Sequence, residues 1–257
     1  INARTMRDLM AGLNNFRNDV DMIVDEGQDL PTGFYLFLEK VTENFTIFAD
    51  ENQRLDENHN SSLREIQSST MLMEEQKLKL SRNYRNTRPI ARLAECFFVG
   101  LATGKPDLPE RNGPKPLMIK TIRPVDLIAN QARSNPDRQI GVFLEKGNLI
   151  ERYYKELSSQ LGSDSLIQKY GYRQRDEVDF EKPGIFLLTY RSAKGLEFDT
   201  VFLPELQEVE MREDDVNRKM TFYVLTSRAR NNLFFLYNGN LLLPILKQIP
   251  EELYDSR

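Results

Sequence analysis

Short apolar runs alternate with amphipathic stretches along most of this chain. A short apolar run between polar turns predicts a buried strand, whereas apolar residues spaced three or four apart predict a helix with one buried face. The strand candidates are residues 21–24, 45–49, 76–80, 117–120, 140–144, 185–189, 200–203 and 233–237. The helix candidates are residues 4–15, 32–41, 87–101, 124–133, 149–161, 217–231 and 241–247. This alternation predicts an α/β protein with a largely parallel sheet.

One polar segment interrupts the pattern. Residues 55–69, LDENHNSSLREIQSS, contain few core residues and are interpreted as a linker and a domain boundary. We therefore predict a first domain over residues 1–70 and a second over residues 71–257. Only two convincing strands precede the boundary, and two parallel strands cannot bury both faces of a sheet. We expect the first domain to be incomplete and the second to be able to stand alone.

Composition limits the classes of partner. The 257 residues are 40% hydrophobic and carry a formal net charge of -4, so no strong bulk attraction to nucleic acid or to an anionic membrane is expected. Any nucleic-acid surface must be local. No apolar run approaches the length that a bilayer requires, and a membrane partner is not expected. A single cysteine excludes an internal disulfide, and no secretory leader is visible, which predicts a cytoplasmic location.

Paired carboxylates end the first predicted strand. In DMIVDEGQDL, three apolar residues lead directly into Asp25 and Glu26. The carboxyl ends of parallel strands are where open α/β sheets bind ligands, and adjacent acids suit a magnesium ligand and a base for water. Acids also follow strands simply because the chain leaves the core, so this pair alone decides little. The same holds for ADENQ, residues 49–53.

An arginine cluster lies in LSRNYRNTRPIARLAECFF, residues 80–98. Its members, placed around a predicted strand-to-helix turn, are Arg82, Arg85, Arg88 and Arg92. The guanidinium fork binds phosphate in a bidentate manner, and Tyr84 in the turn offers a ring for stacking on a base. A helix N-terminus prefers acids, so these arginines oppose the helix dipole. An anionic ligand would explain their placement.

Two further segments carry candidate chemistry. In LLTYRSAKGLEFDTVFLPEL, residues 187–206, two predicted strands flank a Lys-Gly loop that carries Glu197. In KMTFYVLTSRARNNLFFLY, residues 219–237, Arg228 and Arg230 end a predicted helix ahead of a strand. Cations at a helix C-terminus are ordinary, so that arginine pair alone has no specific meaning.

Taken in order, five of these segments resemble the motifs of superfamily 1 helicases, the group that includes UvrD, Rep and PcrA. The segments are VDEGQD, ADENQ, LSRNYRN, TYRSAKGLEF and YVLTSRAR. The strand and helix in IGVFLEKGNLIERYYKEL are also similar to that family, and the resemblance covers about residues 20–237. It implies RecA-like parallel sheets with flanking helices, as one partial and one complete RecA-like domain.

The resemblance also implies roles in ATP hydrolysis. Asp25 would hold Mg²⁺ through water, and Glu26 would be the base that deprotonates the attacking water. Gln53 would sense the γ-phosphate. Arg85 and Arg228 would act as arginine fingers that neutralise charge developing on the transferred phosphoryl group.

Other positions are assigned by the same resemblance to ligand binding. Tyr84 would stack on the base of ATP and Glu197 would accept a hydrogen bond from the ribose, with Gly195 and Arg230 also at the nucleotide. The residues that would contact the backbone of single-stranded DNA are Thr189, Arg191 and Lys194. The implied cofactors are ATP and Mg²⁺, and the implied activity is ATP-driven movement on single-stranded DNA, with RNA left open.

The chain departs from the family in several places. The phosphate loop GxxxxGK[ST] that should precede Asp25 is absent, and GLATGKP, residues 100–106, has the wrong spacing and Pro where the hydroxyl belongs. We therefore expect an upstream segment of the natural protein to supply this loop, and little or no ATP hydrolysis by these residues alone. Arg191 replaces the usual His, and residues 161–185 are too few for the family's large accessory domain. No stacking aromatic follows Gln53.

Two other functions compatible with the sequence stay open. One is a non-hydrolysing, nucleotide-sensing adaptor that binds a partner such as a nuclease or another repair protein. The other is an unrelated α/β metal-dependent hydrolase that uses Asp25, Glu26 and Asp29 as ligands. The hydrolase alternative leaves Arg85 and Arg228 unexplained.

Overall fold

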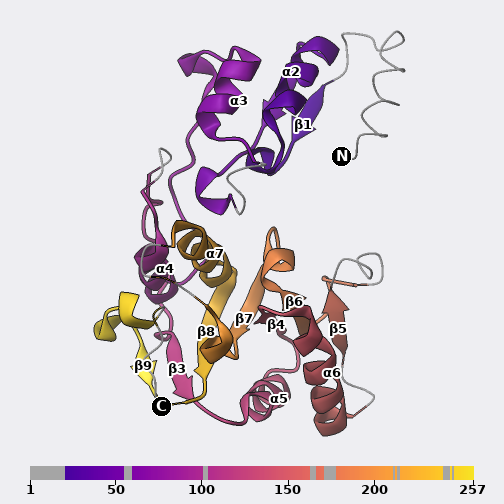
Figure 1. Cartoon of the computed structure of the whole chain (residues 1–257), viewed down its shortest axis with the longest axis vertical. Coiled ribbons are helices and arrows are strands. Elements are labelled where there is room, and N and C mark those ends of the chain that lie inside the picture. The colour runs from indigo at the N-terminus through magenta and orange to yellow at the C-terminus, as the bar shows by residue number, and fades with distance from the viewer. Residues whose placement is uncertain are drawn as a thin grey trace. The chain divides into compact units, whose positions relative to one another are not determined.

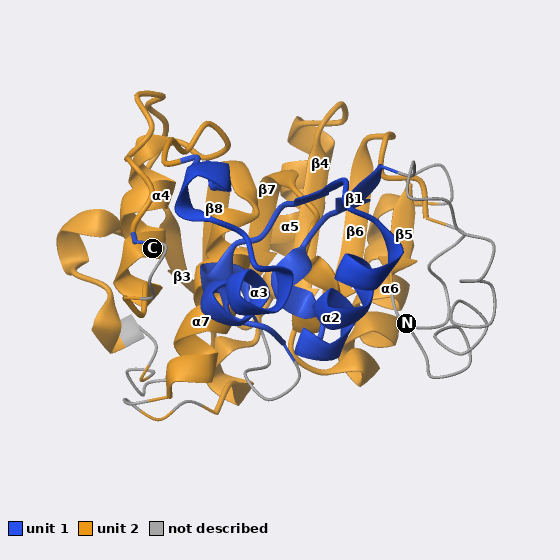
Figure 2. Ribbon diagram, turned by 90° about the horizontal axis from the view of Figure 1, so that it is seen from above, with its two compact units in different colours: residues 1–80, 101–104 blue, residues 81–100, 105–257 orange. Residues whose placement is uncertain are grey.

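The computed structural model describes residues 21–54, 60–100, 104–162, 166–170, 178–210, 212, 215–239, 244 and 246–257. The chain divides into two compact units, coloured in Figure 2. Unit 1 comprises residues 1–80 and 101–104, and unit 2 comprises residues 81–100 and 105–257. The helix predicted over residues 4–15 and most of the one over residues 241–247 fall outside the described residues.

Unit 1 contains a two-stranded parallel sheet within its described residues. Strand β1, Met22–Val24, pairs in parallel with β2, Phe45–Ile47, and helix α2, Thr32–Val41, connects them. These elements confirm the predicted strand–helix–strand order. Their core consists of Val24, Phe34, Tyr35, Leu38 and Ile66.

A helix occupies much of the segment that was predicted to be a linker. Helix α3 spans Leu63–Thr70, and Ile66 buries its apolar side chain in the core of unit 1. A capping box starts this helix, because the Ser62 hydroxyl accepts from the backbone N–H of Glu65 while the Glu65 carboxylate accepts from the backbone N–H of Ser62. The linker interpretation of residues 63–69 is therefore wrong. The polar composition concealed a helix that needs only a narrow apolar stripe.

The strand predicted over residues 76–80 is also wrong. The 3₁₀ helix η4 covers Glu74–Gln76, and residues 77–80 have no regular secondary structure. Leu78 and Leu80 are 94% and 89% exposed. Alternating apolar residues form a strand only where a neighbouring strand and a core surface are available to them.

Unit 2 is built on a seven-stranded sheet within its described residues, with the order β5-β6-β4-β7-β8-β3-β9. All the paired strands run parallel. The strands are β3 Leu117–Lys120, β4 Gln139–Leu144, β5 Ile167–Tyr170, β6 Gly184–Thr189, β7 Phe198–Leu203, β8 Ala229–Tyr237 and β9 Asp255–Ser256. The sheet confirms the predicted α/β class and five predicted strands. The sequence pattern missed β5 and β9 at the sheet edges; both are short, β5 is only partly buried and β9 is exposed.

Helices cover both faces of this sheet (Figure 1). The four helices are α4 Arg88–Ala94, α5 Pro124–Ser134, α6 Gly147–Leu161 and α7 Val216–Ser227. Phe186 and Leu188 of β6 pack in the core that includes α4 and α7, whereas Ile185 and Leu187 pack in the core that includes α5 and α6. Burial on both faces explains why β6 reads as a continuous apolar run.

Helices α4 and α7 are shorter than predicted. Helix α4 ends at Ala94, followed by the 3₁₀ helix η5, Glu95–Phe97, instead of continuing to residue 101. Helix α7 ends at Ser227 because Ala229 already pairs with Phe198 in the parallel ladder between β7 and β8. Arg228 therefore caps the helix, and Arg230 lies in a strand. Among the described residues, no helix has the length and apolar character needed to cross a membrane.

Candidate functional site

In unit 1, the two predicted catalytic acids follow β1 directly. Glu26 adopts φ 50° and ψ 43°, a left-handed conformation that residues other than glycine seldom adopt. The Asp25 carboxylate accepts a hydrogen bond from the backbone N–H of Glu26 at 2.9 Å. Asp25 is exposed and Glu26 is half-buried. The turn thus presents the Asp25 carboxylate to solvent at the carboxyl end of a parallel strand, where the sequence predicted it.

Gln28 links this turn to the second acidic segment, a contact that the sequence did not reveal. Gln28 is fully buried, and its Nε2 donates a hydrogen bond to the Glu26 carboxylate. Its Oε1 accepts from the backbone N–H of Asp50 at 2.9 Å. Gln28 lies in the motif VDEGQD and Asp50 lies in ADENQ. The sequence does not show that the side chain of Gln28 connects the two motifs.

Asp50 orients the predicted γ-phosphate sensor. Its Oδ2 accepts a hydrogen bond from Gln53 Nε2 at 2.8 Å, and its Oδ1 accepts from the backbone N–H of Asn52 at 3.0 Å. A continuous chain of hydrogen bonds therefore runs from Glu26 through Gln28 and Asp50 to Gln53. The structure brings the two predicted acidic segments of unit 1 together.

The donor groups of unit 1 are compatible with a loosely held magnesium ion. No group of three His, Cys, Asp or Glu residues that could hold a metal occurs in the described parts of the chain. Mg²⁺ commonly keeps several waters and takes one or two protein carboxylates together with substrate phosphates, which fits a single exposed Asp25. Asp29 accepts a hydrogen bond from Asn60 Nδ2 at 3.1 Å. The three-carboxylate metal site of the hydrolase alternative gains no support from this geometry.

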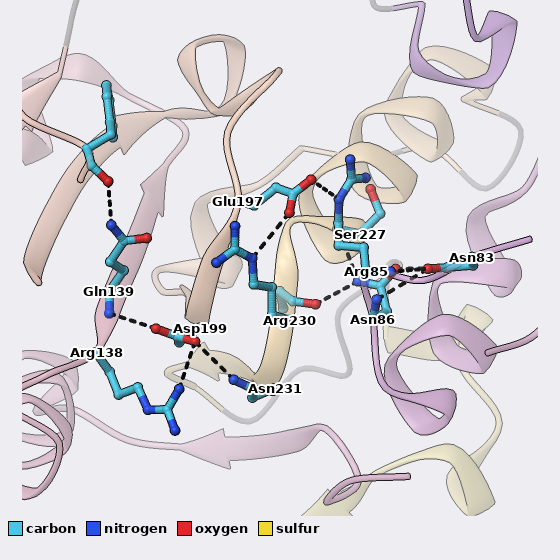
Figure 3. A network of polar contacts seen from close by, with 12 residues as sticks. Asn83, Arg85, Asn86, Arg138, Gln139, Glu197, Asp199, Ser227, Arg230 and Asn231 are labelled. Carbon is cyan, nitrogen blue, oxygen red and sulfur yellow. Dashed lines mark hydrogen bonds and ion pairs between the residues drawn. The ribbon is translucent and has the colours of Figure 1, made fainter. Parts of the chain in front are cut away.

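In unit 2, Glu197 joins two predicted site residues (Figure 3). Its Oε1 pairs with Arg85 Nε, and its Oε2 pairs with Arg230 Nε at 3.2 Å. The three residues come from the segment before α4, from the loop before β7 and from β8. Partial burial raises the pKa of Glu197, but the two arginines outweigh burial and the net pKa lies below its ordinary value.

The side chain of Asn86 fastens the Arg85 turn to the start of β8. Asn83 Oδ1 accepts from the backbone N–H groups of Arg85 and Asn86 at 3.0 and 3.2 Å. Asn86 Nδ2, which is buried, donates to the carbonyl oxygens of Ser227 and Ala229 at 2.9 and 2.6 Å. These two carbonyls flank Arg228, so the helicase-like segments LSRNYRN and YVLTSRAR form one hydrogen-bonded assembly.

Arg228 is 1% exposed, and its Nε donates to the carbonyl oxygen of Val224 at 3.2 Å. The sequence predicted that Arg228 is an arginine finger. That role stays a prediction, and it requires the guanidinium to become accessible to a phosphate. Burial of a guanidinium is costly unless its donors are satisfied, so the Val224 carbonyl lowers the cost of burying Arg228.

Arg111 is a structural partner of the site that carries no motif signal. Its Nη2 donates to the carbonyl oxygens of Arg85 and of Arg230, the latter at 2.6 Å. Its Nη1 donates to Asn231 Oδ1 at 2.7 Å. Arg111 lies in a proline- and glycine-rich loop far from both segments in sequence, so only the tertiary structure could identify it.

Tyr84, the predicted base-stacking residue, presents its ring to solvent. It is 77% exposed, and the Arg82 guanidinium lies 5.7 Å from the ring centroid. The position is compatible with stacking on a base, and that role stays a prediction.

The predicted nucleic-acid contacts lie on the connection between β6 and β7. Thr189 ends β6, and its Oγ1 accepts from the backbone N–H of Ser192 at 3.3 Å, which caps the 3₁₀ helix η7, Tyr190–Ala193. Arg191 in η7 is exposed. Lys194 follows, and Gly195 has φ 76°, a conformation that favours glycine. The same connection ends at Glu197, so the predicted nucleic-acid and nucleotide contacts share one short segment.

Comparisons with known proteins agree with the motif order. The model of the UvrD-like helicase C-terminal domain family matches residues 143–240. A protein of Acanthamoeba polyphaga mimivirus, named as a candidate ATP-dependent DNA helicase, is 26% identical over 250 residues, which cover 86% of this chain and 35% of that protein. The chain thus spans about a third of the length of this relative.

Two solved structures share the fold. The C-terminal domain of a possible DNA helicase from Lactobacillus plantarum aligns with a TM-score of 0.51 at 22% identity, covering 68% of this chain and 98% of that one. Saccharomyces cerevisiae Dbp5 bound to RNA and ADP BeF3 aligns with a TM-score of 0.53 at 13% identity, covering 99% of this chain and 63% of that one. These matches identify residues 143–240 as similar to the UvrD-like helicase C-terminal domain, and the parallel α/β architecture of unit 2 agrees with that similarity.

Proposed function

We propose that this chain contributes nucleotide-responsive and strand-binding parts to an ATP-dependent translocase or helicase that moves on single-stranded DNA. The observation that carries the proposal is the assembly of Arg85, Glu197 and Arg230 from three segments that lie far apart in the sequence. A carboxylate that holds two guanidinium groups side by side is an arrangement suited to a phosphate-bearing ligand.

In unit 1, Glu26 is the proposed base for the attacking water. The hydrogen bond from the buried Gln28 holds its carboxylate in place, and a fixed base is more effective than a mobile one. Asp25 is the proposed ligand of Mg²⁺, an ion that supplies charge neutralisation at the β- and γ-phosphates. Gln53, oriented by Asp50, is the proposed contact to the γ-phosphate.

In unit 2, Arg85 and Arg228 are the proposed arginine fingers, and Glu197 is the proposed acceptor for a ribose hydroxyl. Asn86 ties the Arg85 turn to the backbone on both sides of Arg228. A displacement of either arginine is therefore transmitted to the other through hydrogen-bonded backbone. Tyr84 is the proposed stacking partner for the base, with Gly195 and Arg230 also assigned to nucleotide binding.

Thr189, Arg191 and Lys194 are the proposed contacts to the backbone of single-stranded DNA. A hydroxyl and two cations on one short segment suit sequence-independent phosphate binding. Because this segment continues into Glu197, a nucleotide that engages Glu197 can alter the position of these contacts. This continuity supports coupling between nucleotide state and grip on the strand.

A second candidate function is a non-hydrolysing, nucleotide-sensing adaptor that binds a partner such as a nuclease. It is favoured by one sequence observation, that these 257 residues contain no GxxxxGK[ST] phosphate loop. Hydrolysis would therefore need a phosphate loop in addition to the residues described. The two candidates differ in whether the intact protein turns over ATP.

ATPase activity of the intact protein, measured with and without single-stranded DNA, separates the candidates. For the motor, we expect DNA-stimulated turnover that falls by about 10²–10⁴-fold in Glu26→Gln, the range typical for loss of a general base. Glu43→Gln, which changes an exposed acid in the same unit, is the matched control and should leave turnover unchanged. A folded protein that binds ATP but does not hydrolyse it with or without DNA would contradict the motor and support the adaptor.

A further inference from the structure

A polar cavity of about 470 Å³ lies in unit 2 beside the amino ends of β4, β7 and β8. Its lining residues are Arg111, Asn135, Arg138, Asp199, Thr200, Arg230, Asn231 and Asn232. Every one of them is polar or charged. Figure 3 shows Arg138, Asp199, Asn231 and Arg230 in this region. The volume is within the range of small-molecule sites. Such sites usually have largely apolar walls, whereas the polar walls of this cavity suit a polar ligand.

Positive charge is in excess around the cavity. Among the described residues that line the cavity, Asp199 is the only one with a carboxylate, and it accepts hydrogen bonds from Arg138 Nη1 at 3.2 Å and Asn231 Nδ2 at 3.1 Å. Arg230 shares Glu197 with Arg85. Arg111 donates to two carbonyl oxygens and an amide, all neutral groups. The described lining residues thus carry three guanidinium groups and one carboxylate, which favours binding of an anion.

We propose that this cavity binds the phosphate group of a small anionic ligand, in the chemical class of pyrophosphate and the terminal phosphates of nucleotides. Guanidinium groups bind phosphate oxygens through paired hydrogen bonds, and the asparagine amides add neutral donors. Single-stranded nucleic acid is the less favoured occupant, because binding of strands usually relies on aromatic side chains that stack on bases, and no described residue of the lining is aromatic.

The cavity does not contain the residues proposed for ATP in unit 1, Asp25 and Glu26, or those proposed in unit 2, Arg85 and Glu197. The two sites share only Arg230, whose Nε pairs with Glu197 while the residue also lines the cavity. An anion in the cavity is therefore placed to influence the Glu197 network through Arg230. The proposal goes beyond the proposed function and does not depend on ATP hydrolysis.

Isothermal titration calorimetry of this chain with inorganic pyrophosphate, in metal-free buffer containing EDTA, tests the proposal. Arg138→Gln should weaken binding by about tenfold, the effect expected for loss of one charge-assisted contact. Arg123→Gln is the matched control, because Arg123 is likewise an exposed arginine paired with one aspartate, Asp126, but it does not line the cavity. Absence of saturable binding by the wild-type chain, or equal weakening in both variants, would overturn the proposal.

Asp199→Asn provides a test of opposite sign. Removing the only carboxylate of the lining should tighten pyrophosphate binding by about tenfold, and a folding defect cannot produce a gain in affinity. Thermal unfolding of each variant shows whether it is folded. Weaker binding by a folded Asp199→Asn variant would contradict the charge argument and overturn the assignment.

Two further arms separate this site from the others. Gln53→Ala, which removes the proposed γ-phosphate contact in unit 1, should bind metal-free pyrophosphate as the wild type does. A loss there would place the anion at the proposed ATP-binding residues and overturn the cavity assignment while leaving the proposed function intact. Normal pyrophosphate binding together with a failed ATPase test would contradict the proposed motor function and leave the cavity assignment intact. Displacement of pyrophosphate by a thymidine oligonucleotide, abolished by Arg138→Gln, would replace the small ligand with nucleic acid and overturn the proposal.

Discussion

The Asn86 amide donates hydrogen bonds to the two backbone carbonyls that flank Arg228, those of Ser227 and Ala229. Ser227 is the last residue of α7, so its carbonyl has no acceptor role within the helix, and Ala229 is the first residue of β8. One buried side chain supplies the missing donors and at the same time fixes the turn that carries Arg85. The two predicted arginine fingers therefore depend on one amide.

Replacement of Asn86 by alanine should destabilise unit 2. The change leaves two carbonyl acceptors without their donor in a buried environment, at a cost of about 1–3 kcal/mol in the free energy of unfolding. Denaturant unfolding followed by circular dichroism measures it. Asn130→Ala, at an exposed position on α5, is the control and should change stability little. Equal stability of the two variants would show that the amide has no such role.

Gln28 should have a comparable role in unit 1. Gln28→Met keeps the size of the side chain but removes the hydrogen bonds to Glu26 and to the backbone of Asp50, and we expect a loss of about 1–3 kcal/mol. Gln76→Met, at an exposed position in the same unit, is the control for chemical denaturation. In a protein with ATPase activity, Gln28→Met should also lower turnover, because Glu26 loses its fixed orientation. Wild-type stability of Gln28→Met would contradict the bridge.

Gly27, which follows the two acids after β1, has no space for a larger side chain. A Cβ at this position would lie 2.9 Å from the Tyr35 hydroxyl and 2.7 Å from Ile47 Cγ2. Gly27→Ala should therefore cost about 1–3 kcal/mol, as overpacking commonly does. A double-mutant cycle with Tyr35→Phe, which removes the hydroxyl but keeps the ring, is the measurement. The cost of Gly27→Ala should shrink in the Tyr35→Phe background, and an undiminished cost would exclude the hydroxyl as its cause.

The ion pairs of Glu197 predict an acid-dependent loss of stability. The pKa of Glu197 is lowered from 4.5 in the folded protein, so its contribution is complete above pH 4.5 and is lost as the pH falls through the lower folded value. The difference in unfolding free energy between the wild type and Glu197→Gln should therefore narrow as the pH falls below 4.5. The side chain is 29% exposed, so screening by solvent keeps the effect small.

Unfolding free energies of both proteins across this pH range test the prediction. The exposed Glu181 provides the control substitution, Glu181→Gln, which separates the loss of Glu197 from the loss of any one carboxylate in unit 2. A Glu197→Gln difference that is constant with pH would show that the Arg85 and Arg230 pairs do not stabilise the carboxylate.

Local pattern determined much of the fold. The apolar runs of β4 and β6 are each buried on both faces, so their composition alone marks them as central strands of a parallel sheet. The predicted acids after β1 and the arginines before α4 and at the start of β8 also follow from contiguous motifs. These positions can be predicted from the sequence because each reactive side chain and the strand or helix end that positions it lie within a few residues of one another.

Errors arose where a segment's neighbours in space decide its structure. The exposed residues 77–80 have the alternation of a strand but not its regular structure, whereas α3 has little apolar character but gains a capping box and a core contact through Ile66. The sequence predicts a helix that continues to residue 231, whereas α7 ends at Ser227 because Ala229 pairs with Phe198 in the sheet. Propensity is a weak guide where tertiary contacts compete with it.

The sequence by itself determined which residue types stand at the ends of the strands and in what order the motifs occur. The tertiary structure decided which side chains connect them: Gln28 between two acidic segments, Asn86 between two arginine segments, and Arg111 across the carbonyls of Arg85 and Arg230. The physical reason is that a hydrogen bond between distant segments does not produce a periodic pattern of residues in the sequence. Only the folded backbone brings its donor and acceptor together.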